Sequence, residues 1–391
     1  HMISSIVRGK DAKALVQSLA VNNLEKFGVG KARHYIACGH DGNVVGDGIL
    51  FCQAENEIEL VGRAAGHKWL QFHAETGGWD VTVESDQIFS QNAAGQRRVY
   101  RYQVEGPHAV ALLEKLNGAP LPDAPRTTIV SMTIAGHKVS GFRMAMAGGP
   151  GYEIWGPWAE GEAVKAAILQ AGHEFDLRQV GSYAYFSTAL EIGWIPRPVH
   201  AIYTGEKMRA FREWLPADSN EVKWSLGGSL YSPKIEDYYF NPYELGYGHL
   251  VKFDHDFIGR DALERMARQT NRQKVALVWN PDDVAALTRT YTDRDALPAL
   301  AGARLGVGRP RRRHAGADHG RSHHRRRARP VGHPRPQRAR AGILPAGRRV
   351  RLCRVAARAH HGRPAAAGHG GLRRAVRARR RGDAGGPRHG W

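Results

Sequence analysis

The first 285 residues alternate between short apolar runs and glycine-rich breaks, as in an ordinary globular α+β protein. The glycine-rich segment from Gly42 to Gly48 separates two apolar runs and is typical of a hairpin turn. Apolar runs and alternating patterns predict strands at residues 49–51, 58–61 and 98–104, and helical spacing predicts helices at 66–76 and 107–116. The second helix should stop at Asn117-Gly118, because glycine favours a helix end.

One short pattern occurs twice in the chain. Residues 7–16 (VRGKDAKALV) and 104–113 (VEGPHAVALL) each combine the end of a strand, a glycine and a helix with paired aliphatic positions. Residues 258–263 (IGRDAL) repeat it in shorter form. Duplicated strand–helix units predict two pseudosymmetric α+β subdomains with a boundary near residues 120–135 and a ligand where they meet.

The regular pattern fades after Trp279, and residues 286–391 have a different composition. The last 91 residues hold 26 arginines, no lysine and two acidic residues, and their only aromatic residue is Trp391. Such a segment cannot bury enough apolar surface to offset its chain entropy. We therefore expect residues 1–285 to form the folded region and residues 286–391 to be a disordered tail.

The formal net charge of +20 belongs to this tail, because the first 300 residues carry a net charge of −4. One interpretation is a basic arm that binds nucleic acid. The other is translation of GC-rich DNA in the wrong frame, since GC-rich codons mostly encode Arg, Ala, Gly and Pro. The complete absence of lysine favours the second interpretation, so nucleic acid is not an expected partner.

Cysteine usage and hydropathy exclude several classes of protein. Cys38, Cys52 and Cys353 are an odd number at wide spacing, which predicts neither a disulfide framework nor a metal site. No apolar run reaches the roughly 18 residues that a membrane-spanning helix needs, and no signal peptide opens the chain. We expect a cytoplasmic protein without a metal.

Four segments together resemble the folate-dependent methyl-transfer family built on the glycine-cleavage T-protein fold. They are DGNVVGDGILF at 41–51, MAMAGGPGYEIWGP at 144–157, the stretch 181–196, and FIGRDAL at 257–263, in the family's order. The resemblance implies a T-protein-like α+β fold and tetrahydrofolate as the methyl acceptor. It also implies sequence missing upstream, and a C-terminal β-domain near residue 300 where the basic tail stands instead.

Within that family the chain is similar to the tetrahydrofolate-dependent O-demethylases of aryl methyl ethers. Their motifs are matched by HAETGG at 73–78, GWIP at 193–196 and IYTGE at 202–206. Where T-proteins have Gly-Ala-Arg-Asp, residues 183–186 read YAYF, and a phenol suits a neutral aromatic leaving group. The resemblance implies transfer of the methyl group of vanillate, syringate or 3-O-methylgallate to tetrahydrofolate. A T-protein-like enzyme for aminomethyl or N-methyl substrates is the alternative.

The resemblance assigns catalytic roles to Tyr185 and Asp47. Departure of a phenolate is easier when a donor reaches its oxygen, and the ordinary pKa of a tyrosine, roughly 10, is close to that of a phenol. Tyr185 is the expected donor, although a tyrosine bonded to a carbonyl in the core is the alternative. Asp47 would orient the folate near N5, or would be a turn aspartate that bonds its own backbone.

The remaining candidate residues are expected to bind the substrate or the folate. Arg63 offers a planar donor fork to a benzoate carboxylate, unless it forms a surface ion pair. His1 lies in the register of a family histidine on the substrate side, or it is a cloning remnant. Tyr247 belongs to a tyrosine-rich stretch at residues 238–247, which is expected to line the aryl pocket or to be structural. Glu153 would accept two N–H bonds from the pterin, and Trp194 would stack on the folate or pack in the core.

Overall fold

The computed structural model describes residues 2–87, 92, 95–144, 149–181, 184, 187–188, 191–196, 198–223, 225–226, 230–275 and 279–289. The α+β fold expected from the sequence is confirmed, with two antiparallel sheets and helices packed on each. The predicted disordered tail lies outside the described residues, except for residues 286–289.

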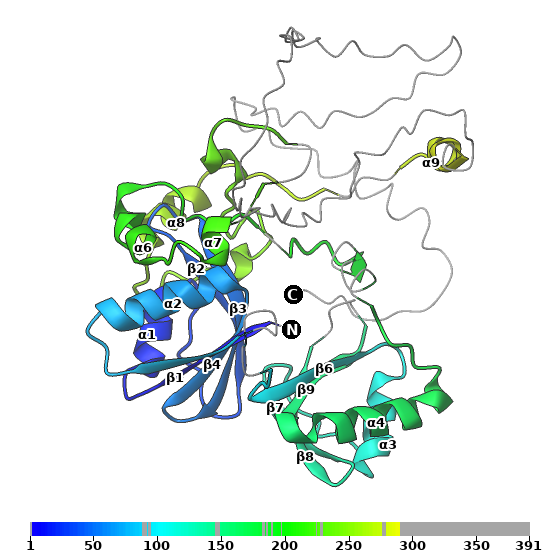
Figure 1. Cartoon of the computed structure of the whole chain (residues 1–391). Coiled ribbons are helices and arrows are strands. Elements are labelled where there is room, and N and C mark those ends of the chain that lie inside the picture. Colours follow the sequence, from blue (N-terminus) through cyan, green and yellow to red (C-terminus); the bar gives the residue numbers. More distant parts are fainter. Residues whose placement is uncertain are drawn as a thin grey trace, which may run out of the picture. The chain divides into compact units, whose positions relative to one another are not determined.

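The first sheet has five strands in the order β2-β3-β4-β1-β5, and every neighbouring pair is antiparallel. Its elements are β1 (Ile3–Arg8), α1 (Ala12–Leu19), β2 (Ala32–Cys38), β3 (Val44–Ala54), β4 (Glu57–Gly62), α2 (Ala64–Thr76) and β5 (Thr82–Asp86). Helices α1 and α2 lie on one face of this sheet (Figure 1). Leu15, Leu50 and Trp69 are fully buried between the helices and the strands.

The second sheet has four antiparallel strands in the order β6-β9-β8-β7. Its elements are β6 (Val99–Glu105), α3 (Ala109–Asn117), β7 (Ile129–Ile134), β8 (His137–Arg143), β9 (Gly151–Pro157), the 3-10 turn η2 (Trp158–Glu160), α4 (Gly161–Gly172) and the 3-10 turn η3 (His173–Phe175). Helices α3 and α4 cover one face of it (Figure 1). Leu113, Ile154 and Val164 fill the core between them.

The repeated sequence pattern forms the same local structure in both sheets. Gly9 joins β1 to α1 and Gly106 joins β6 to α3, with φ of 141° and 130°. In each case the carbonyl of the glycine accepts a hydrogen bond at 3.1 Å, from Ala12 in one and from Ala109 in the other. The third glycine, Gly259, precedes α8 (Arg260–Ala267) with φ of 92°. A side chain is strained at such positive φ values, which explains glycine at all three junctions.

The change from the first sheet to the second falls between Asp86 and Val99, earlier than the expected boundary near residues 120–135. Residues 120–128 instead run back to the first sheet. There the Ala32 amide donates to the Thr127 carbonyl at 2.8 Å, and the Ile129 amide donates to Gly30 at 2.8 Å. Backbone bonds therefore tie β7 to the beginning of β2.

The glycine-rich segment that the sequence analysis interpreted as a turn is mostly strand. The turn spans Gly39 to Asn43, and β3 begins at Val44, so Asp47 lies within a strand. Glycine is needed here because α2 packs directly on the strand. A Cβ atom on Gly46 would lie 2.5 Å from the backbone nitrogen of Gly66. Glycine in a strand often marks such a close approach of another backbone.

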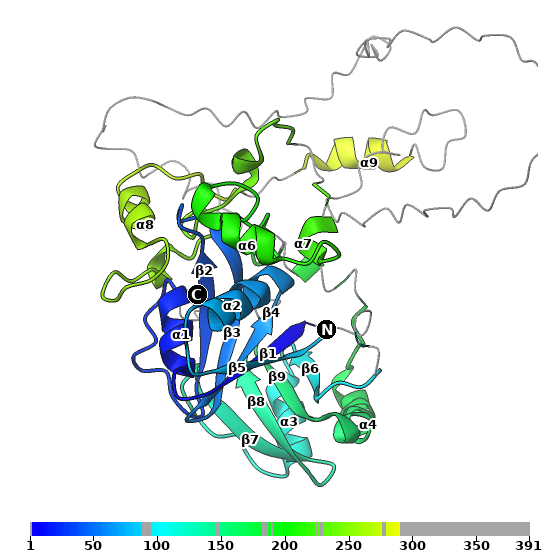
Figure 2. The ribbon, with the colours of Figure 1, turned by 60° about the vertical axis from the view of Figure 1, so that its left-hand side comes forward.

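Residues 198–267 return to the first sheet and contain η4 (Glu206–Met208), α6 (Arg209–Trp214), α7 (Asn220–Lys223), η5 (Ile235–Tyr238), η6 (Gly248–Leu250) and α8, where η marks 3-10 turns. A last helix, α9 (Pro281–Arg289), follows later in the chain. Helix α6 lies beside α2 (Figure 2). Phe211 of α6 packs against Trp69 of α2 with ring centroids 4.9 Å apart. Leu245 and Val251 pack on Ile36 of β2. This return brings loop residues to the start of β3.

Candidate active site

A chain of hydrogen bonds joins three residues that the sequence analysis singled out. The indole nitrogen Nε1 of Trp194 donates to the Tyr247 hydroxyl at 2.9 Å, and that hydroxyl donates to Oδ2 of Asp47 at 3.1 Å. Tyr247 directly precedes η6, and Trp194 lies in the segment 191–196. Residues from three distant parts of the chain therefore meet at one carboxylate.

His34 completes the surroundings of Asp47. Ile36 pairs with Asp47 between β2 and β3, so His34, two residues earlier, is a diagonal neighbour on the same face. Its Nε2 lies 3.5 Å from Oδ2 of Asp47, and its ring meets the Tyr247 ring edge-on with centroids 4.7 Å apart. His34 could not be recognised from the sequence, because one histidine in a strand gives no signal until its neighbour is known.

Asp47 is an ionised group in this setting. Burial raises the pKa of its carboxyl, but the contacts with His34 and Tyr247 and the charge of Arg63 outweigh burial, so that this pKa lies below its ordinary value. Burial and the neighbouring carboxylate raise the pKa of Tyr247. Tyr247 is thus a neutral hydrogen-bond donor and Asp47 a negative acceptor.

Arg63 and His200 lie next to this group. Gly62 pairs with Gly48, so Arg63, which directly precedes α2, comes beside Asp47 at the end of β4. His200 is buried, and its Nδ1 lies 2.9 Å from the Val45 carbonyl. Burial lowers the pKa of His200 to about 4, so the imidazole is neutral near pH 7. In this state Nδ1 carries the proton and donates to that carbonyl.

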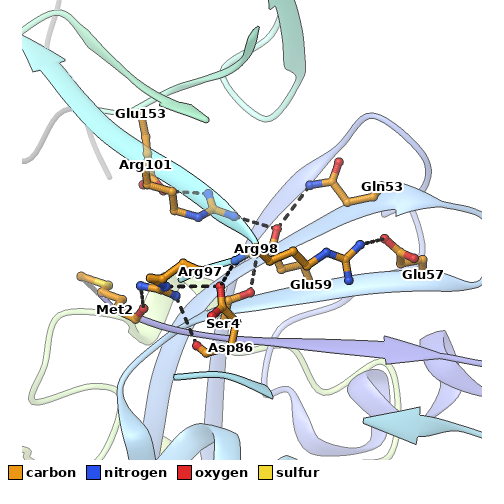
Figure 3. A network of polar contacts seen from close by, with 10 residues as sticks. All are labelled: Met2, Ser4, Gln53, Glu57, Glu59, Asp86, Arg97, Arg98, Arg101 and Glu153. Atoms are coloured by element: carbon orange, nitrogen blue, oxygen red, sulfur yellow. Dashed lines mark hydrogen bonds and ion pairs between the residues drawn. The ribbon is translucent and has the colours of Figure 1, made fainter. Parts of the chain in front are cut away.

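Glu153 lies in a second polar group, which connects the two sheets. Arg101 on β6 binds Oε1 of Glu153 on β9 at 2.9 Å through Nη1, and Oε2 of Glu59 on β4 at 2.7 Å through Nη2 (Figure 3). Ser4 and Gln53 also donate to Glu59. Nothing in the sequence marks Arg101 and Glu59 as site residues, because a charged residue on a strand normally faces solvent.

Aromatic rings enclose the guanidinium of Arg101. Its central carbon lies 5.0 Å from the ring centroid of Phe51 and 4.8 Å from that of Trp155. Phe51 contacts both Trp155 and Phe142 of the second sheet with edge-to-face geometry. Cation–π contacts of this kind are stronger where water is excluded. Arg101, Glu59 and Glu153, here called the Arg101 group, are therefore part of a packed junction between the sheets.

The two polar groups lie on the same face of the first sheet. Asp47, Ile49 and Phe51 alternate with residues that point toward α1 and α2, and Phe51 packs on the second sheet. Asp47 and Phe51 are four residues apart, which is about 13 Å along a strand. One elongated ligand could therefore contact both groups.

Two candidates, Tyr185 and His1, lie outside the described residues, and their roles stay predictions. Two hollows on the described surface are lined by other residues. One of about 380 Å³ is lined by residues such as Lys13, Phe27 and Cys52, and another by residues such as Lys26 and Arg33. In the described part of the chain, no three metal-ligating side chains come together. No helix among these residues is long and apolar enough to span a membrane.

Comparison with known proteins decides the family. The model of the GCVT N-terminal domain matches residues 1–197, half of the chain. The chain belongs to the GCVT family. Enzymes of this family use tetrahydrofolate.

The family includes relatives with different activities. The chain is 42% identical over 291 residues to syringate O-demethylase of Sphingobium sp. (strain SYK-6), covering 74% of this chain and 63% of that protein. It is 32% identical over 296 residues to sesamin methylene transferase of Sinomonas sp., covering 75% and 63%. It is 27% identical over 281 residues to an aminomethyltransferase of Caldanaerobacter subterraneus, covering 70% and 63%. The chain thus spans less than two thirds of the length of each of these relatives.

Proposed function

We propose that this GCVT-family protein transfers the methyl group of a methoxybenzoate to tetrahydrofolate. Vanillate, syringate and 3-O-methylgallate are the expected substrates, and a phenol and 5-methyltetrahydrofolate the products. The methyl–oxygen bond of the ether breaks, a methyl–nitrogen bond forms at N5, and the proton that N5 loses is balanced by the one that the phenolate gains. The observation that carries the proposal is the ionised Asp47, held by Tyr247 and His34 beside Arg63.

The described residues fit a reduced folate. Its pteridine edge presents N–H donors, and Oε2 of Glu153 receives no hydrogen bond from any residue that the structure describes. A carboxylate fixed by an arginine is a good acceptor for such an edge. When bound, tetrahydrofolate supplies the nitrogen that accepts the methyl group.

Asp47, Arg63 and Tyr185 have separate roles in the proposed reaction. An ionised carboxylate stabilises the positive charge that develops on an amine as it is alkylated, and Asp47 is ionised at neutral pH. Arg63 binds the carboxylate of the benzoate. Tyr185 donates to the phenolate oxygen as the ether bond breaks. Support for an aryl ether as the substrate comes from the syringate O-demethylase relative.

The test is incubation of the full chain with syringate or vanillate and tetrahydrofolate, with chromatographic detection of the phenol and of 5-methyltetrahydrofolate. Both products should form in equal amounts, and neither should form without tetrahydrofolate. The Tyr185→Phe variant should lose most of kcat and still bind vanillate. Formaldehyde release from dimethylglycine, with no phenol from any aryl ether, would overturn the proposal in favour of an N-methyl substrate.

A further inference from the structure

We infer that Arg101 is a positioning residue, which holds the carboxylate of Glu153 for a donor-bearing edge of the ligand. The inference rests on the proposed function, because it concerns the folate of that reaction. Its structural basis is that one guanidinium binds two carboxylates on different sheets, Glu59 at 2.7 Å and Glu153 at 2.9 Å (Figure 3).

The two carboxylates differ in whether both of their oxygens already accept hydrogen bonds. Glu59 already accepts at both oxygens, because Ser4 donates to Oε1 while Arg101 and Gln53 donate to Oε2. Glu153 uses only Oε1 for Arg101, and Oε2 has no donor among the residues that the structure describes. Glu59 is 6% exposed and serves as the fixed counter-ion of Arg101. Glu153 alone is therefore available to a ligand.

The net charge of the Arg101 group determines which part of a ligand it can bind. One guanidinium and two carboxylates sum to −1, and the neighbouring Arg97 is already paired with Asp86 at 3.2 Å. A partly buried excess of negative charge is unfavourable unless donors reach it. The aminopyrimidine edge of a pterin supplies such donors, whereas the carboxylates of the folate tail would be repelled.

The geometry also explains why an arginine is required. A planar fork can bind two carboxylates at once, while an ammonium group acts as a single point charge. The ring centroids of Phe51 and Trp155 lie within 5.0 Å of the guanidinium carbon, and the rings limit its rotation. Since β6 and β9 are paired from Val99 to Glu105, the Arg101–Glu153 contact also has a fixed register. The orientation of Glu153 is thus set by residues of two sheets.

The experiment measures binding of 5-formyltetrahydrofolate to the full chain by titration calorimetry, without turnover. Arg101→Met should weaken binding at least about tenfold, the loss expected for a hydrogen bond to a charged group. Glu153→Gln should weaken it as well, and the double variant should be no weaker than Glu153→Gln alone. Vanillate affinity should be unchanged in all three. Arg98→Met is the matched control, because Arg98 directly precedes β6 and its side chain pairs, among the described residues, with Glu57 and Glu84 near the surface.

Each outcome separates the positioning role from the proposed function. Wild-type protein that binds no folate overturns both. If the wild type binds and Arg101→Met binds equally well, only the positioning role fails. Additive losses in the double variant would mean that Arg101 contributes to folate binding independently of Glu153, which would overturn the positioning role. If Arg101→Met does not fold, Arg101→Lys replaces it; lysine keeps the charge, and undiminished folate affinity would contradict the inference.

Discussion

The hydroxyl of Tyr247 donates a hydrogen bond of 3.1 Å to Oδ2 of Asp47, which lies 200 residues earlier in the chain. The loop before η6 therefore fixes a carboxylate on β3. The same hydroxyl accepts from Trp194 at 2.9 Å, so its rotation is determined. A substitution at Tyr247 therefore tests the role of Asp47 and of the residues that contact it.

Tyr247→Phe should lower kcat for syringate demethylation about tenfold, because Asp47 loses a charge-assisted hydrogen bond. The pKa of Asp47 should rise, since the Tyr247 contact helps to lower it. Steady-state kinetics measure the change in kcat, and their dependence on pH on the acidic side measures the change in this pKa. Tyr243→Phe is the control, because the Tyr243 hydroxyl bonds the Leu263 carbonyl instead. Equal kcat values for the two variants would show that Tyr247 has no role in the reaction.

Arg63→Gln should raise KM for vanillate at least about tenfold, through loss of a paired carboxylate contact. The same variant should leave KM unchanged for guaiacol, the corresponding ether without a carboxylate. Because the charge of Arg63 also lowers the pKa of Asp47, kcat is expected to change with both substrates. Parallel increases in KM for vanillate and guaiacol would show that Arg63 does not bind the carboxylate of vanillate.

Gly46→Ala should destabilise the protein by about 1–3 kcal/mol or more, because the new Cβ would meet the backbone of α2 at 2.5 Å. Gly66→Ala is a sharp control. A Cβ on Gly66 would lie 3.7 Å from the nearest atoms, and alanine favours a helix by about 1 kcal/mol. It should leave stability unchanged or increase it. Urea denaturation of the two variants compares them, and equal losses would contradict the described packing of α2 on β3.

Stability should fall as the pH is lowered from about 6.5 to about 4. Burial lowers the pKa of both His67 and His200 to about 4, while an unfolded histidine titrates near 6.5. In this window the unfolded chain binds protons that the folded chain does not, so the free energy of unfolding rises with pH. His67→Gln should flatten the dependence, since glutamine does not titrate. Denaturation curves at pH 5 and 7.5 measure the slope, and an unchanged slope would mean that His67 is not neutral in the fold.

The sequence predicted the elements that depend on local pattern. Gly9 and Gly106 fall at equivalent junctions because the strand–glycine–helix unit needs positive φ there. The position of the hairpin turn was wrong by several residues. The glycines between Val44 and Gly48 predict a turn. Their presence in a strand is explained only by the packing of α2 on Gly46.

The candidate site was predictable only as far as the family resemblance reached. It indicated Asp47 and Trp194, while a tyrosine-rich stretch indicated Tyr247, and the fold brings the three together. Glu59 and Arg101 could not be recognised, because each lies in a strand where a charge normally faces water. Their burial results from the second sheet, and a pattern within one strand contains no information about what covers it.

The Arg101 group also bears on how the chain avoids misfolding. Buried ion pairs add little net stability, but separating one is costly. If β9 slipped by one residue against β6, Glu153 would turn to the opposite face, and Arg101 would lose one of its two partners in an apolar setting. Slipped pairings of the second sheet are therefore penalised by electrostatics as well as by packing, which gives β9 a single stable alignment.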